Sequence, residues 1–103
     1  MNAVLVYMTA GDKAEAVRIG HTLVEEKLAA CANVLDGMTS IYRWEGEICE
    51  DAEVVLIAKT VDALAPALTE RVKALHSYDC PCVVTLPVSQ FDRSPLKLLA
   101  PLN

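Results

Sequence analysis

Residues 31–60, CANVLDGMTSIYRWEGEICEDAEVVLIAKT, decide the fold of this 103-residue chain. The stretch predicts two extended arms over 31–44 and 48–60, joined by a turn at Trp44-Glu45-Gly46-Glu47. Asp36-Gly37 interrupts the two-residue alternation of the first arm and indicates a bulge or bend. Each arm holds about a dozen residues, roughly twice the length of a typical strand. The hairpin should therefore project beyond the helices that cover the sheet.

The segment before the hairpin predicts a strand followed by a helix. Residues 3–9 form a continuous apolar run, as in a buried strand. The next residues predict a helix over 13–29, with Asp12 as its N-cap and Glu15 at the capping-box spacing. Its expected apolar face is made by Val17, Gly20, Val24 and Leu28.

The segment after the hairpin repeats this pattern. Asp62 predicts the cap of a second helix, and Pro66 is acceptable only near its first turn. The apolar residues of this helix recur on one face, at Leu64, Leu68, Val72 and Leu75. Residues 83–88 predict a last strand, and Ser94-Pro95 predicts the start of a short helical turn.

The order of elements predicts an α+β fold, a ferredoxin-like β-α-β-β-α-β sandwich with both helices on one face of an antiparallel sheet. All of residues 1–103 are expected to form a single domain. Hydrophobic residues make up 53% of the chain, more than a domain of this size hides by itself. This excess and the long hairpin, whose edge needs a neighbour, both predict an oligomer.

Charge and composition exclude several classes of partner. The net charge is −5 and the nine Lys and Arg residues are scattered, which argues against nucleic-acid binding. No apolar segment approaches the length of a membrane span, and the N-terminal residues lack the basic region of a signal peptide. A cytoplasmic location is therefore expected, with the four cysteines as reduced thiols.

Cys80-Pro81-Cys82 allows two interpretations. In a strand both thiols would point to the same side, where they could face one soft cation, with His76 and Asp79 near enough in sequence to complete the site. Alternatively, both cysteines are small hydrophobes at the entrance of a strand. Cys31 follows an Ala-Ala pair, where a buried thiol is the simpler interpretation.

Other polar and aromatic residues are also ambiguous. His76 ends the second predicted helix, so it either caps that helix or handles a ligand or proton. By alternation Tyr42 and Trp44 share a face of the hairpin, which is typical of interface packing. Lys59 either reaches the surface or points into an interfacial pocket. The chain has no nucleophile elbow, no helical H-E-x-x-H motif and no phosphate-binding glycine-rich loop, so no enzyme is predicted.

The assembled stretches resemble the CutA family of divalent-cation tolerance proteins. The resemblance is carried by LVEEKLAACANV (23–34), TSIYRWEGEI (39–48), EVVLIAKT (53–60) and HSYDCPCVVTLPV (76–88). It implies a homotrimer in which the long hairpins extend the sheets of neighbouring subunits and leave clefts at the interfaces. Family members typically have an aliphatic residue and an acid at positions 80 and 82, so the two cysteines are a departure in this chain.

The resemblance also implies functional residues and a function. Metal binding is implied at Cys31 and His76, and the cysteines at 80 and 82 are added from this chain's own sequence. Copper or another divalent cation, held weakly, is the implied cofactor, with a small ligand as a further occupant of the cleft. Two alternatives remain open, namely a thiol enzyme that uses Cys80 or Cys82 with His76, and a structural or signalling trimer with no direct role in metal binding. The residues implied to line or brace the interface cleft are Tyr42, Trp44, Glu53, Lys59, His76 and Tyr78.

Overall fold

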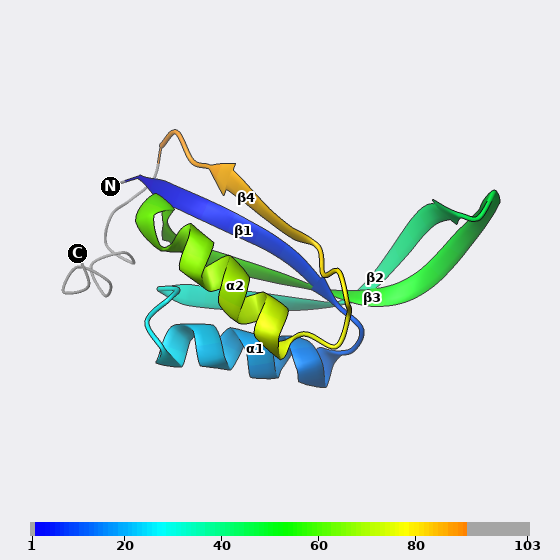
Figure 1. Cartoon of the computed structure of the whole chain (residues 1–103), viewed down its shortest axis with the longest axis horizontal. Helices are drawn as coiled ribbons and strands as arrows, with labels where there is room; N and C mark the ends of the chain where they lie inside the picture. Colours follow the sequence, from blue (N-terminus) through cyan, green and yellow to red (C-terminus); the bar gives the residue numbers. More distant parts are fainter. Residues whose placement is uncertain (1, 91–103) are drawn as a thin grey trace.

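The computed structural model describes residues 2–90 and shows the predicted order of elements (Figure 1). The strands form one antiparallel sheet in the order β2-β3-β1-β4, which confirms a mixed α+β fold. The prediction for Ser94-Pro95 lies outside the described residues. The elements are β1 (Ala3–Ala10), α1 (Lys13–Glu25), β2 (Cys31–Trp44), β3 (Glu47–Val61), a short 3-10 turn (Asp62–Leu64), α2 (Ala65–Leu75) and β4 (Val83–Pro87).

Both helices pack on one face of the sheet and enclose the core. Alternation along β1 and β3 turns every second residue toward them, for example Val6 opposite Ala58 and Met8 opposite Leu56. These side chains are buried together with Ile19 and with side chains from both helices. The main core cluster therefore lies on one face of the sheet.

Within residues 2–90, no helix covers the opposite face of the sheet, which we call the open face. It carries the residues that alternate with the core positions, and many of them are apolar. The strand registers place Tyr7, Ile57 and Val84 side by side there, next to the row formed by Leu5 and Leu86. Val84 and Leu86 are exposed, so the described part of one chain leaves apolar surface uncovered on this face.

The β2-β3 hairpin extends well beyond the helices, as predicted, and gives the molecule a long axis of 47 Å (Figure 1). Its two-residue turn is Glu45-Gly46, and both residues have the positive φ angles that a type I′ turn requires. The predicted irregularity at Asp36-Gly37 is a β-bulge, because the pairing shifts between Leu35 and Met38. Gly37 has a φ of 85°, which a residue with a side chain adopts only at a cost.

Two predictions about α1 are wrong. The helix ends at Glu25 instead of residue 29, because Lys27 takes a left-handed conformation and the N–H groups of Leu28 and Ala29 both donate to the Leu23 carbonyl. Its buried face also differs from the predicted one, since Val17 and Val24 are 46% and 40% exposed. The core face is instead made by Ala16, Ile19, Gly20 and Leu23.

The prediction that Asp62 caps the second helix is also wrong. Asp62 begins the 3-10 turn, and its carboxylate accepts hydrogen bonds from the N–H groups of Ala63 and Asn2. It therefore ties the start of β1 to the end of β3, one turn ahead of α2. The expected position of Pro66 in the first turn of α2 is confirmed.

Glu15 connects two loops at the end of the sheet where the hairpin leaves it. Asp12 caps α1 as predicted, because its carboxylate accepts the Glu15 N–H at 2.8 Å. The buried Glu15 carboxylate accepts the Gly11 N–H at 3.2 Å and the Ser77 N–H at 2.7 Å. Burial raises the pKa of Glu15, but the hydrogen bonds from Ser77 and Gly11 outweigh it and the pKa is lowered.

We expect Glu15→Gln to lower the free energy of unfolding by about 1–3 kcal/mol, because a buried charged acceptor of two N–H groups is lost. Because the folded-state pKa is lowered, the contribution of Glu15 is present above the unfolded-state pKa and disappears as pH falls through the folded-state pKa. Urea unfolding at several acidic pH values should therefore show a smaller loss of stability in the variant than in the wild type. Glu25→Gln is the control, since Glu25 is exposed and, among the described residues, pairs with exposed His21. Equal effects of the two substitutions would contradict the role of Glu15.

Candidate functional site

A cleft of about 850 Å³ lies between the hairpin and the segment that connects α2 to β4. One wall comes from the hairpin, and the other comes from the connecting segment together with Gly11 at the end of β1. The cleft brings together four of the six residues that the family resemblance assigns to the interface cleft. Tyr42, Trp44 and Glu53 line it from the hairpin, and Tyr78 lines it from the connecting segment. The residues that line it are Gly11, Tyr42, Trp44, Asp51, Ala52, Glu53, Tyr78, Cys80 and Cys82.

Glu53 joins the two walls of the cleft. One of its carboxylate oxygens accepts the Ser40 hydroxyl at 2.6 Å, within the hairpin. The other accepts the Tyr78 hydroxyl at 2.9 Å, from the connecting segment. Burial, followed by the hydrogen bond to Glu53, raises the pKa of Tyr78 to about 12. Tyr78 is therefore a protonated donor at neutral pH.

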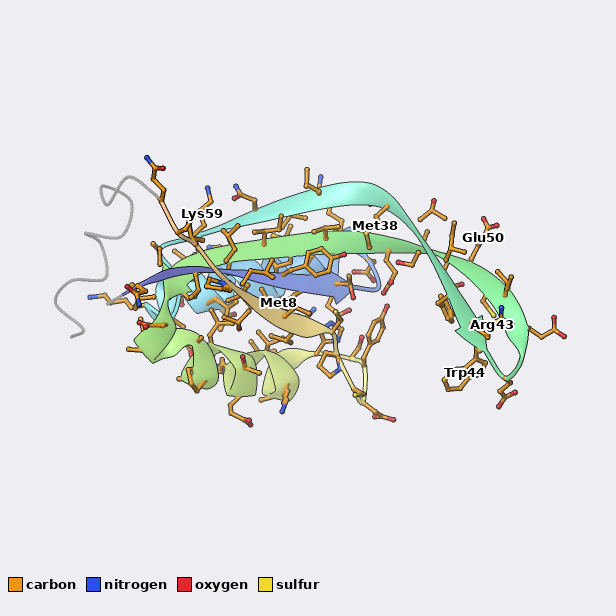
Figure 2. The ribbon with its side chains drawn as sticks, turned by 90° about the horizontal axis from the view of Figure 1, so that it is seen from above. Met8, Met38, Arg43, Trp44, Glu50 and Lys59 are labelled. Atoms are coloured by element: carbon orange, nitrogen blue, oxygen red, sulfur yellow. The ribbon has the colours of Figure 1, made fainter. Side chains whose placement is uncertain are left out.

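A second tyrosine-carboxylate pair lies farther out on the hairpin. The Tyr42 hydroxyl donates to the carboxylate of Asp51, and this hydrogen bond is the main reason that the pKa of Tyr42 is raised to about 12. Trp44 lies near the tip of the hairpin and is 64% exposed (Figure 2). The cleft thus presents two carboxylates and an exposed indole, and none of the described residues that line it is basic.

His76 braces the cleft from behind. Its ring is buried, with Nε2 2.7 Å from the Thr9 carbonyl oxygen and Nδ1 accepting the Tyr78 N–H at 3.0 Å. The ring also packs against Tyr78, with 4.6 Å between the ring centroids. A carbonyl oxygen can only accept, so Nε2 is the ring nitrogen that donates to Thr9. Both nitrogens are therefore occupied, and His76 positions Tyr78 instead of facing the cleft; the predicted helix-end position is confirmed.

The four cysteines are free thiols in different surroundings. Cys80 and Cys82 are exposed and line the cleft, in an irregular segment that precedes β4 and is not part of a strand. Cys31 is half-buried on β2, opposite Lys59 in the register. Within residues 2–90, no three His, Cys, Asp or Glu side chains lie close enough together to hold a metal ion. A single chain therefore does not unite Cys31 and His76 with the cysteine pair.

Lys59 lies far from the cleft within one chain. It is exposed on the open face, where the registers place it between Cys31 and Leu5. Figure 2 shows Lys59 at one end of the sheet and Trp44 at the other, near the tip of the hairpin. A common site for these two residues requires more than one chain.

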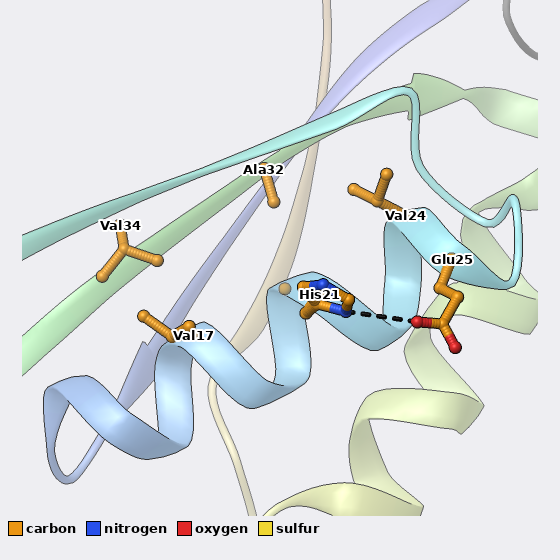
Figure 3. Close-up of a pocket in the computed structure, with 7 residues that line it drawn as sticks. Val17, His21, Val24, Glu25, Ala32 and Val34 are labelled. Carbon is orange, nitrogen blue, oxygen red and sulfur yellow. Dashed lines mark ion pairs between the residues drawn. The ribbon is translucent and has the colours of Figure 1, made fainter.

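A second concavity, a groove of about 450 Å³, lies between α1 and β2 (Figure 3). Its walls are Val17 and Val24 of the helix and Ala32 and Val34 of the strand. Among the described residues that line it, the polar groups are the His21 ring and the Glu25 carboxylate, an exposed pair 3.3 Å apart. We place the candidate functional site at the cleft, since this groove offers little polar chemistry.

Sequence reasoning missed Asp51 and Gly11 as cleft residues. Asp51 had a detectable signal, because it lies two residues from Glu53 on a strand and therefore shares its face. Gly11 had no such sequence signal, because its place at the cleft depends on how the loop after β1 contacts Tyr78.

Comparison with known proteins identifies the family. The family model for the CutA1 divalent ion tolerance protein matches residues 4–100. A divalent-cation tolerance protein CutA of Thermus thermophilus is 47% identical over 95 residues, which cover 92% of each chain. Human protein CutA is 43% identical over 84 residues, and these cover 82% of this chain but only 47% of the human protein.

Solved structures agree with these sequence matches. The structure of CutA1 from Oryza sativa has a TM-score of 0.91 at 42% identity and covers 98% of this chain and 93% of its own. The structure named as the periplasmic divalent cation tolerance protein CutA of Archaeoglobus fulgidus has a TM-score of 0.89 at 34% identity, with 96% of both chains covered. A rice relative is named chloroplastic, so the names of relatives favour no single compartment. Within residues 2–90, no helix has both the length and the apolarity that crossing a bilayer requires. The extent of these matches shows that the chain belongs to the CutA1 divalent ion tolerance family.

Proposed function

We propose that the cleft binds a divalent cation, with copper the first candidate, and that this binding underlies a role in metal tolerance. The observation that carries the proposal is the convergence of Asp51 and Glu53 in a cleft without a basic lining residue among those described. Carboxylate oxygens attract cations, and a net charge of −5 adds to this attraction. The Tyr42 and Tyr78 hydroxyls hold these carboxylates in place as donors. A small ligand with a cationic group suits the same cleft, because Trp44 offers an exposed aromatic face.

The chain is also proposed to act as a homotrimer of the ferredoxin-like fold. The support is the uncovered apolar surface of the open face and the two sheet edges, β2 and β4, that have no partner strand within the described part of the chain. Three copies around one axis would cover the open faces and pair the edges. Such an assembly would bring Lys59 and Cys31 of one copy toward the cleft of a neighbour, which would complete the set of residues implied by the family resemblance.

Geometry weighs against the thiol-enzyme alternative. A thiol enzyme needs a base within hydrogen-bond reach of its cysteine. Both ring nitrogens of His76 already have partners, Thr9 and Tyr78. We therefore propose no enzymatic activity for this chain. The four free thiols favour a reducing compartment such as the cytoplasm.

Leu86→Asp should convert the trimer into monomers, because it places a charge on the apolar open face opposite Leu5. Native mass spectrometry reports the number of chains directly. Thr85→Asp is the matched control, since Thr85 is exposed but alternates to the other side of β4 and pairs with Val6. A monomeric wild type, or trimers in both variants, would contradict the proposed interface.

Glu53→Gln should weaken divalent cation binding at least about tenfold, because it removes a charged oxygen donor that also orders Tyr78. Calorimetric titration of the whole protein with Cu²⁺ measures this effect. Glu50→Gln is the matched control, since Glu50 is exposed on the same strand but points to the other face of the hairpin. If both variants bind like the wild type, the cleft is not the cation site, and the trimer without a direct metal role becomes the better account.

The Tyr78 phenol should ionise with a midpoint of about 12, because burial and Glu53 oppose the charged form. The stabilisation from this raised pKa is complete below the unfolded-state value of about 10 and is lost as pH rises through the folded-state value. An ultraviolet pH titration of the wild type minus that of Tyr78→Phe isolates this group. In Glu53→Gln the midpoint should move down toward the ordinary tyrosine value, whereas a wild-type midpoint of about 10 would contradict the network.

A further inference from the structure

The segment Cys80-Pro81-Cys82 presents two thiols that the proposed divalent site does not use. Both are free, exposed and part of the cleft wall. Pro81 between them has a fixed φ angle and no N–H group, which limits the conformations of this short segment. The two thiols are therefore two residues apart in sequence and line the same accessible cleft.

The number of available ligands narrows the choice of metal. Within residues 2–90, no group of three His, Cys, Asp or Glu side chains could hold a metal ion, so the two cysteines have no third protein ligand in this part of their own chain. His76 is not a third ligand, because its nitrogens bond to Thr9 and Tyr78. Zinc in structural sites takes four protein ligands. Cu(I) is a soft cation that thiolates select, and it is satisfied by two of them in line.

The electrostatics of the cleft also suit a cation. Asp51 and Glu53 line the same cleft as the two cysteines, and none of the described lining residues is basic. A soft cation prefers thiolate sulfur to carboxylate oxygen, so these oxygens provide a negative field without displacing sulfur as the ligand.

We propose that Cys80 and Cys82 form a two-thiolate site for Cu(I), separate in ligands and in metal preference from the divalent site. Binding breaks two S–H bonds, forms two S–Cu bonds and releases two protons to solvent. No electron is transferred, because copper enters and stays as Cu(I). The site depends on the thiol pair alone, so it stands independently of the proposed divalent function.

The test is an oxygen-free competition of the full chain, in its native assembly, against a chromogenic Cu(I) chelator. The wild type should bind one Cu(I) per chain. Cys80→Ser and Cys82→Ser should each lower the affinity at least about 100-fold, since even an outer-shell partner is worth roughly 10- to 100-fold. Cys49→Ser is the matched control, because Cys49 is a half-buried cysteine on β3 outside the lining of the cleft, and this variant should bind Cu(I) like the wild type.

A second measurement needs no variant. Bound Cu(I) should protect Cys80 and Cys82 from alkylation in the wild type, while Cys49 keeps its rate, as mapped by peptide mass spectrometry. The proposal is overturned if the doubly substituted chain retains Cu(I), if only one ion binds per three chains, or if alkylation of both thiols is unaffected. The divalent site is tested separately by Glu53→Gln, and a chain lacking both thiols should still bind Cu²⁺ through that site.

Discussion

The single extra residue in β2 at Asp36-Gly37 determines what the hairpin can do. Before the bulge, Ala32 and Val34 face the helices and pair with core residues of β3. After it, the even-numbered residues Ser40, Tyr42 and Trp44 lie on the opposite side of the sheet, with Asp51 and Glu53. Without the shift, alternation would place the aromatic residues on the helix side, away from these carboxylates. The bulge therefore creates the aromatic and acidic wall of the cleft.

The second wall of the cleft, the segment that connects α2 to β4, is held by a chain of hydrogen bonds that begins at Glu15 of α1. Glu15 holds the backbone at Ser77, His76 holds the backbone at Tyr78, and Tyr78 in turn reaches Glu53 on the hairpin. The first and last of these links join segments far apart in sequence, whereas the His76–Tyr78 link is local, so the position of the connecting segment depends on tertiary contacts. The two phenols remain protonated at neutral pH, which lets each donate to a carboxylate that would otherwise repel its neighbour.

The sequence was sufficient for the order of elements, the long hairpin, its turn and its bulge, because these follow from local periodicity and from Asp-Gly and Glu-Gly pairs. It failed for the buried face of α1, since Val17 and Val24 have helical spacing as good as that of Ile19 and Leu23. The choice between the two faces is made by the sheet, because β2 is an edge strand and covers only one side of the helix. For the cleft, alternation on the hairpin was informative, whereas the path of residues 76–82 was not readable, because no periodic pattern governs an irregular segment.

The part of the hairpin beyond the bulge would link ligand binding to assembly. In one chain, the Tyr78 hydroxyl joins the two walls of the cleft through Glu53, and the Tyr7 hydroxyl donates to the Met38 sulfur at 3.6 Å. A two-stranded ribbon on its own is marginally stable in water. In the proposed trimer, neighbouring copies would support the hairpin and cover Trp44 and the open face at the same time. A ligand in the cleft would then favour assembly, and assembly would favour the ligand by the same factor, because linkage between two equilibria is reciprocal.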